Sequence, residues 1–153
     1  MSSKSAKTAG VVAVLCAAAC GLPGAFAYTK PGTIRITDVQ QRHTFVDLGP
    51  GGRSPGDIDV YRSLLYNRRI QAKPLGHAEM VCTTISATSQ HCDATYFLPR
   101  GELVVAGVIT SRLIYILAVV GGTDYYNNAR GTLTVTSLHR SPVRELLLFR
   151  LVL

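Results

Sequence analysis

The sequence is poor in helical patterns, repeats and clustered charge. After residue 27, no stretch carries apolar residues at the period of an amphipathic helix, and no segment is repeated or of low complexity. The basic residues are scattered, with Arg68 and Arg69 as the only adjacent pair, and no nucleic-acid motif accompanies the formal net charge of +7. These absences argue against a helical protein and a repeat array, and we expect no nucleic-acid partner.

A hydrophobic run long enough to cross a membrane is also missing. The apolar stretch from Ala9 to Leu22 is shorter than the roughly 20 residues that a membrane-spanning helix needs. Lys4 and Lys7 precede it and the small-residue pattern Ala25–Ala27 follows it, which is the order of a secretory signal peptide. We therefore expect residues 1–27 to be cleaved and the mature chain to be secreted, without a transmembrane helix.

A lipoprotein signal is the open alternative, in which Cys20 becomes lipidated. The three residues before Cys20 are all alanine, whereas a branched apolar residue is expected three positions before a lipidated cysteine. The cleaved signal peptide is therefore favoured. Either route leaves residues 28–153 as one domain, which is long enough to bury about two thirds of its unfolded surface in a single core.

Short runs rich in β-branched, aliphatic and aromatic residues make up the rest of the chain. Such runs favour β strands, and clusters of Gly, Pro, Asn and Asp separate them. This spacing of short strands and turns predicts an all-β sandwich or barrel. The runs are Thr33–Thr37, Ile58–Leu65, Ala78–Ile85, Ala94–Leu98, Leu103–Ile109, Leu113–Val120, Thr132–Ser137 and Glu145–Leu153.

Some of these runs are apolar at both alternating positions, as in Leu103–Ile109 and Leu113–Val120. A strand with one face in water should instead alternate between apolar and polar residues. No helix is expected to cover the second face. We therefore expect another copy of the chain to cover it, in a homo-oligomer.

Only Cys82 and Cys92 remain after the predicted signal peptide. The residues 86–89 between them are typical of a hairpin loop, and pairing around this loop sets the two cysteines opposite each other. Opposed Cβ atoms lie about 4.5–5.5 Å apart, close enough for a disulfide, which export permits. Two inert thiols, or a reactive or metal-binding cysteine, are the open alternatives. No familiar metal-ligand spacing is present, so we expect no metal.

The same hairpin register sorts the side chains of the two strands. Met80, Cys82, Ala94 and Tyr96 share one face, and this apolar set is expected to point toward the interior. Tyr96 either donates a hydrogen bond to a ligand or simply fills the core.

A series of segments resembles a known family. The segments are Asp47–Pro50, Ser54–Asp57, Ser63–Tyr66, Val81–Thr83, Cys92–Pro99, Gly101–Leu103 and Ala118–Gly131. In this order they resemble the bacterial dirigent-like proteins of the allene oxide cyclase barrel family, over roughly residues 33–138, and the last segment is the most specific. The resemblance implies an eight-stranded antiparallel β-barrel of the allene oxide cyclase/dirigent type. The lumen of such a barrel is either packed with side chains or able to hold one small ligand.

The resemblance also implies how such a protein would act. Plant cyclases of this fold steer the ring closure of an unstable fatty-acid epoxide, and dirigent proteins orient the coupling of phenoxy radicals. We therefore expect a barrel that binds or positions a small hydrophobic ligand, aromatic or lipid-derived. An isomerase or cyclase acting on a reactive oxygenated intermediate, and a structural or surface-interaction protein with a packed lumen, are the alternatives. No cofactor, metal or hydrolytic triad is implied, and whether the chain is an enzyme stays open.

Pocket residues of the plant cyclase can be carried over one by one. They fall on Arg35, Thr37, Ser63, Cys82 and Ile116, and only the cysteine at Cys82 is kept. The first-strand glutamate of the family is replaced by Arg35, which inverts the charge offered to an intermediate and argues against the plant reaction.

Two orientations of Arg35 remain open. It either faces the lumen and pairs with a ligand or an acid, or it faces solvent while Ile34 and Ile36 point inward. Together with Tyr96, the ligand-pocket candidates are thus Arg35, Thr37, Ser63 and Cys82.

Overall fold

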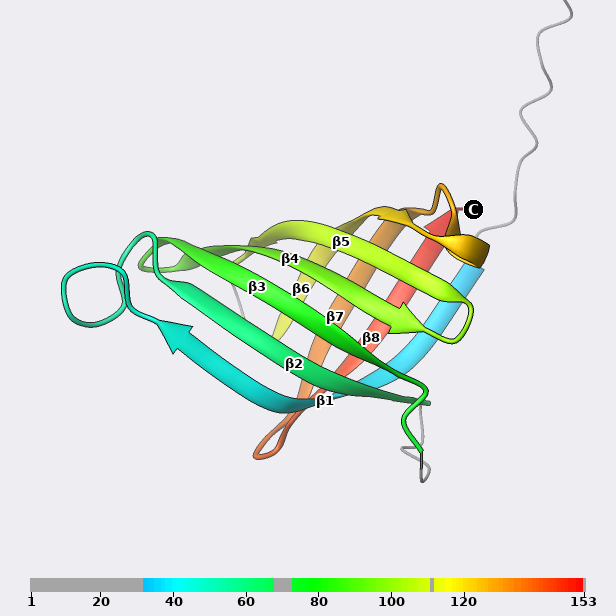
Figure 1. Ribbon diagram of the computed structural model, residues 1–153, viewed down its shortest axis with the longest axis horizontal. Helices are drawn as coiled ribbons and strands as arrows, with labels where there is room; N and C mark the ends of the chain where they lie inside the picture. The colour runs from blue at the N-terminus through cyan, green and yellow to red at the C-terminus, as the bar shows by residue number, and fades with distance from the viewer. Residues whose placement is uncertain (1–31, 68–72, 111, 153) are drawn as a thin grey trace, which may run out of the picture.

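The structure is a computed structural model that describes residues 32–67, 73–110 and 112–152. Within these residues, each strand pairs antiparallel with the next, and β8 closes the barrel on β1 (Figure 1). The elements are β1 (Gly32–Val46), β2 (Ile58–Asn67), β3 (Gly76–Ser86), β4 (Ser89–Leu98), β5 (Gly101–Ile109), β6 (Ile114–Gly122), the 3-10 helix η1 (Asp124–Tyr126), β7 (Arg130–Arg140) and β8 (Val143–Val152). The prediction of an all-β, eight-stranded antiparallel barrel is confirmed.

Each predicted run overlaps one strand, and β1 differs most from its prediction. The run was expected to end at Thr37, but the strand continues to Val46. The added residues are largely polar and exposed, so they carry no apolar alternation. Their backbone pairs with β2 as far as Val46 opposite Ile58, and this pairing, not side-chain burial, keeps the segment extended.

The hairpin of β3 and β4 has the register predicted from its cysteines. Cys82 lies opposite Cys92 and Met80 opposite Ala94. The two cysteine sulfur atoms form a disulfide. Tyr96 and both cysteines are buried, so the predicted inward face is confirmed.

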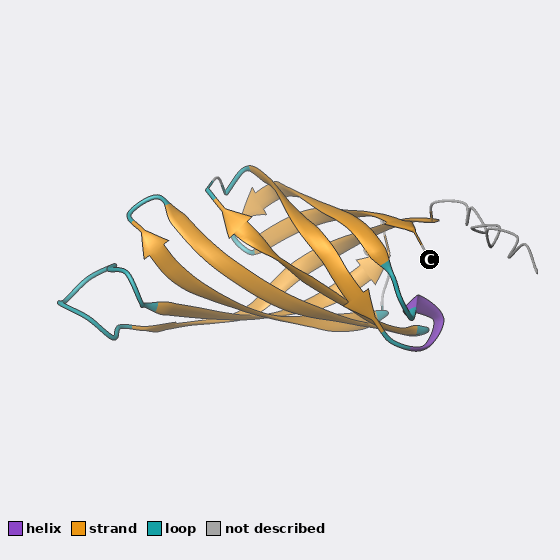
Figure 2. Ribbon diagram, turned by 90° about the horizontal axis from the view of Figure 1, so that it is seen from above, coloured by secondary structure: helices purple, strands orange, loops and turns teal. Residues whose placement is uncertain are grey.

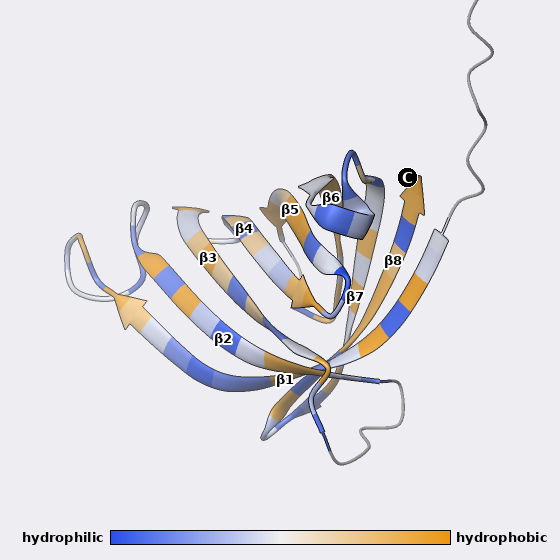
Figure 3. Cartoon of the chain, turned by 45° about the vertical axis from the view of Figure 1, so that its right-hand side comes forward, coloured by the Kyte–Doolittle hydropathy of each residue, from blue (hydrophilic) through white to orange (hydrophobic). Residues whose placement is uncertain are grey.

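One half of the lumen is filled by a hydrophobic core. The inward positions of neighbouring strands supply large aliphatic and aromatic side chains, and hydropathy alternates along several strands (Figure 3). The largest fully buried side chains of this core are Phe149, Leu65, Leu103, Leu117, Leu133, Leu147 and Leu151. This close-packed core borders the other half of the lumen.

The packed half ends at η1, which lies at the opposite end of the barrel from the loop between β1 and β2 (Figures 1 and 2). Tyr126 and Ala129 are buried there as part of the core. A Cβ atom on Gly122 would lie 2.6 Å from the carbonyl oxygens of both Glu102 and Tyr126, so only glycine permits this close approach. The double-glycine segment that carried the resemblance therefore has an architectural role.

The outer surface is uneven in polarity. The outward side chains of β5 to β8 include the exposed apolar residues Val108, Ile114, Ile116, Val120, Leu138 and Val152. On β2 to β4 the outer face carries Arg62, Glu79, His91 and Asp93 among its exposed residues, beside the apolar Val60, Val81 and Ile85. The apolar face is the one on which the expectation of a homo-oligomer rests.

The predicted signal peptide and the lipidation alternative at Cys20 lie outside the described residues, so both stay predictions. Among the residues that are described, no helix has the length and apolar character needed to span a membrane.

Candidate functional site

The half of the lumen beyond the packed core is open. It contains a cavity of about 470 Å³, within the range of roughly 300–1,000 Å³ that is common for small-molecule sites. Its lining includes Asp38, Gln40, Tyr61, Ser63, Ala78, Met80, Cys82, Gln90, Tyr96, Arg112, Tyr115, Ser137, His139, Arg140 and Glu145. The alternative of a fully packed lumen does not describe this half of the barrel.

Two carboxyl groups face each other across neighbouring strands at the floor of this cavity. Asp38 on β1 is the register partner of Glu145 on β8, and both residues line the cavity. Directly opposed side chains have Cβ atoms about 4.5–5.5 Å apart, so the two acids interact. Both occupy the inward phase of their strands, next in that phase to the core residues Ile36 and Leu147.

The environment of this pair favours protonation. Burial raises the pKa of Asp38 to about 7, the charge of Glu145 adds to the rise, and a hydrogen bond with Ser63 opposes it. Burial also raises the pKa of Glu145, and a hydrogen bond from the hydroxyl of Tyr115 opposes that rise. The Tyr115 Oη and Glu145 Oε2 atoms are 3.2 Å apart. Near neutral pH the pair can therefore hold a proton on Asp38.

Tyrosine rings complete the floor. Burial raises the pKa of Tyr96 and of Tyr115 well above the usual value, so both hydroxyls stay neutral at physiological pH. The ring of Tyr96 meets Phe149 of the core edge-on, with centroids 5.2 Å apart. The floor thus combines flat apolar surface with hydroxyl and carboxyl groups.

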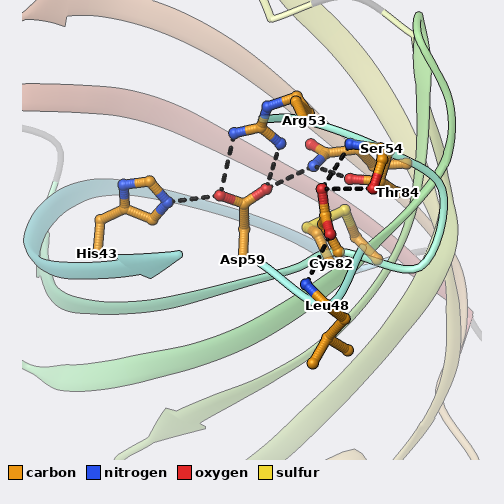
Figure 4. A network of polar contacts seen from close by, with 10 residues as sticks. His43, Leu48, Arg53, Ser54, Asp59, Cys82 and Thr84 are labelled. Carbon is orange, nitrogen blue, oxygen red and sulfur yellow. Dashed lines mark hydrogen bonds and ion pairs between the residues drawn. A yellow bond between two sulfur atoms is a disulfide. The ribbon is translucent and has the colours of Figure 1, made fainter. Parts of the chain in front are cut away.

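A different acid, Asp59, is the centre of a hydrogen-bond network at the mouth of the barrel (Figure 4). Asp59 on β2 is fully buried and accepts hydrogen bonds of 2.6 Å from each of three side chains, those of His43, Arg53 and Gln90. Burial alone would raise the pKa of Asp59, but the bonds from Arg53, His43 and Gln90 outweigh it and lower the pKa to about 2. Asp59 is therefore a fully paired anion.

The neighbouring Asp57 fixes the loop that carries Arg53. Its carboxylate accepts hydrogen bonds from the backbone N–H groups of Leu48 and Ser54. These bonds lower the pKa of Asp57. The loop between β1 and β2 is thereby held so that Arg53 reaches Asp59.

Three of the sequence-predicted pocket residues line the cavity, namely Ser63, Cys82 and Tyr96. Cys82 is in the disulfide and offers no thiol. Thr37 is buried but alternates with Ile36 and Asp38 on the opposite face of β1, and it does not line the cavity. Whether Ser63 or Tyr96 contacts a ligand stays a prediction.

Arg35 lies outside the lumen. It is exposed, between Ile34 and Ile36, whose inward positions pack against the core. The lumen placement that the resemblance suggested is therefore wrong, and the solvent-facing alternative holds. The lumen acid of the first strand is Asp38.

The same shift in register affects β6. Ile116, onto which a pocket tyrosine of the plant cyclase was carried, is exposed, whereas the adjacent Tyr115 lines the cavity. Neither Tyr115 nor the two floor acids was among the sequence-predicted candidates. The signal that could have found the acids is a carboxylate on the apolar phase of a strand, as in Ile34, Ile36, Asp38.

Comparisons with known proteins agree with this architecture. No family model matches the sequence, and no curated protein matches it. Among solved structures, a pyocyanin demethylase is similar at 22% identity with a TM-score of 0.69, over 79% of this chain and 100% of that one. A pterocarpan synthase dirigent protein is 15% identical with a TM-score of 0.66, over 86% and 92%.

An exo-specific intermolecular Diels-Alderase is 14% identical with a TM-score of 0.65, over 80% of this chain and 99% of that one. At these identities the likeness concerns the fold. The chain shares the barrel fold of dirigent proteins and of cyclase-type barrels.

Proposed function

We propose that the protein binds and positions a small hydrophobic ligand, aromatic or lipid-derived, in the open half of its lumen. The observation that carries the proposal is the cavity of about 470 Å³, whose floor is made of tyrosine rings and two carboxyl groups. Apolar walls with a few convergent polar groups are the usual composition of a small-molecule site. The packed half beneath it holds the floor rigid, which favours positioning.

Binding can be tested with N-phenylnaphthylamine, an uncharged probe that fluoresces in apolar surroundings. We expect saturable fluorescence with the wild type and its loss in Ala78→Phe, because Ala78 lines the cavity and a phenyl ring there fills it. Val81→Phe is the matched control, since Val81 lies on the outer face of the same strand and is 45% exposed. Equal binding by all three proteins would overturn the proposal.

A second candidate, an isomerase or cyclase, is favoured by the acid pair on the floor. In such a reaction the Asp38 carboxyl gives its proton to a ligand oxygen, while the Glu145 carboxylate takes a proton from the ligand. The ligand keeps its elemental composition, so no further reactant is needed. Tyr115, bonded to Glu145, orients the accepting carboxylate.

Product stereochemistry tests this candidate. The protein would be incubated with an allene oxide, and the products separated by chiral chromatography. An enantiomeric excess that is lost in Asp38→Asn and kept in Asp93→Asn supports catalysis, because Asp93 is an exposed acid on the outer phase of β4 and does not line the cavity. Racemic products indistinguishable from those in buffer would contradict it.

The proposal also includes the export of the protein and its oligomeric state. The protein acts after export, which the sequence pattern of residues 1–27 and the disulfide support. It acts as a homo-oligomer, in which the apolar outer face of β5 to β8 is covered by another copy. Light scattering of the purified protein and intact-mass analysis of secreted material, with an N-terminus at Tyr28, test these two points.

A further inference from the structure

The mouth of the cavity carries two arginine side chains that form no ion pair with the described residues. Arg112, just before β6, and Arg140, at the end of β7, both line the cavity. Neither forms an ion pair with any residue in the described ranges 32–67, 73–110 and 112–152. Arg53, by contrast, has its guanidinium bound to both oxygens of Asp59.

The acids of the lumen do not neutralise these two arginines. Asp59 is already paired with three donors. Asp38 and Glu145 lie on the floor, where burial favours their neutral forms. Within the part of the chain that the structure describes, the cavity is thus polarised, with guanidinium groups that form no ion pair at the rim and protonatable acids at the bottom.

A smaller pocket adjoins the rim and extends this cationic surface. Its volume is about 260 Å³, and it shares Arg112, Gln90 and Ile109 with the main cavity. The rest of its lining is dominated by short hydroxyl and small side chains, including Thr84, Ser89 and Thr110. Guanidinium, amide and hydroxyl groups are the donors that typically hold carboxylate, sulfonate or phosphate groups.

We infer that the ligand of this barrel is an amphipathic anion, whose apolar body fills the lumen and whose carboxylate, sulfonate or phosphate group is held at the mouth by Arg112 and Arg140. This inference rests on the proposed function and names the chemical class of its ligand. It also gives the ligand one orientation, because the charged end is drawn to the guanidinium groups at the rim while the apolar body fills the lumen. A fixed orientation presents the opposite end of the ligand to Asp38 and Tyr96.

A pair of probes isolates the charged group. Anilinonaphthalene sulfonate has the ring system of N-phenylnaphthylamine with a sulfonate added, so the two differ in the anion alone. We expect the wild type to bind the sulfonate about tenfold more tightly than the uncharged probe, a typical effect of charge-assisted hydrogen bonds to arginine. In the double variant Arg112→Gln, Arg140→Gln this preference should vanish, while the affinity for the uncharged probe stays within about twofold.

Controls separate the mouth from the rest of the surface. Arg35→Gln removes an exposed arginine from the outer face and should leave both affinities unchanged. Ala78→Phe should abolish the binding of both probes. Sulfonate binding that survives Ala78→Phe would place the probe outside the lumen and overturn the inference.

The remaining outcomes distinguish this inference from the proposed function. If the uncharged probe binds but the sulfonate is not preferred, or the double variant keeps the preference, the anion site is wrong while lumen binding stands. If neither probe binds, the proposed function itself fails. Competition by dodecanoate and by dodecyl phosphate then ranks the head groups, and displacement by neither would contradict an amphipathic anion as ligand.

Discussion

Two buried aspartates, Asp59 at the mouth and Asp38 at the floor, show how one residue type serves two purposes in the same lumen. Asp59 receives hydrogen bonds from a guanidinium, an imidazole and an amide, and its pKa falls to about 2. Asp38 has the hydroxyl of Ser63 and faces another acid, and burial raises its pKa to about 7. The first is a permanent anion that holds a loop, and the second is a group that can give up a proton near neutral pH.

The largest effect on stability is expected from removing the charge of Asp59 at the mouth. Asp59→Asn replaces the shared carboxylate of Arg53 and His43 with a neutral amide that has only one acceptor oxygen, and it should lower the free energy of unfolding by about 3 kcal/mol at pH 7. The folded-state pKa of Asp59 is depressed, so its stabilisation is present above the unfolded pKa near 4 and is lost as pH falls toward 2. Urea denaturation at pH 7 and pH 3 measures both points.

Asp93→Asn is the matched control for that experiment, because Asp93 is an exposed acid with one long contact to His91. Its unfolding free energy should change by no more than about 0.5 kcal/mol. An equally small effect of Asp59→Asn would show that the mouth network contributes nothing to stability.

The disulfide reinforces the same end of the barrel, since Cys82 is the register partner of Asp59. Replacing both Cys82 and Cys92 by alanine should lower the free energy of unfolding by about 2–3 kcal/mol, because a short closed loop is released in the unfolded chain. Denaturation curves measure the loss. Peptide mapping of the unreduced protein should show the linked pair, and free thiols at both positions would contradict the structure.

At the floor, the ionisation of Asp38 is expected to lower the stability of the folded protein, the opposite of the effect of Asp59. The folded-state pKa of Asp38 is raised, so the folded protein binds more protons than the unfolded one between about pH 4 and 7, and stability falls as pH rises through this window. Asp38→Asn removes that dependence and should raise the free energy of unfolding at pH 8 by about 2 kcal/mol, with little change at pH 4. Thermal melts across this range measure it, and a loss of stability at pH 8 would count against a neutral floor acid.

A lumen residue could be predicted from the sequence only where the sequence showed which side chains of its strand face inward. Cys82 and Cys92 set the register of one hairpin, and from it Tyr96 was correctly placed in the lumen. On β1 the resemblance pointed to Arg35, although the alternation of Ile34 and Ile36 already indicated the opposite phase.

Other parts of the site had no local signal. The pairing of Asp38 with Glu145 joins the first strand to the last and exists only because the barrel closes. Arg112 and Arg140 come from the ends of different hairpins. Both line the same cavity because of the strand order of the barrel, which no short-range sequence pattern encodes.

The smallest effect is expected outside the lumen. Arg35→Ala removes an exposed side chain whose strand neighbours pack inward without it, so the free energy of unfolding should change by less than about 0.5 kcal/mol. Probe binding should be unchanged as well. A destabilisation of several kcal/mol in chemical denaturation would mean that Arg35 is buried in an internal ion pair.

The most direct test of the account is a nuclear magnetic resonance titration of the side-chain carboxyl carbons of Asp38 and Asp59 in one sample. The structure predicts a midpoint near pH 7 for Asp38 and one near pH 2 for Asp59. Glu145→Gln should lower the Asp38 midpoint, because it removes a neighbouring negative charge. Midpoints near pH 4 for both aspartates would mean that the floor is solvated like the surface, and would contradict a proton-donating acid in the lumen.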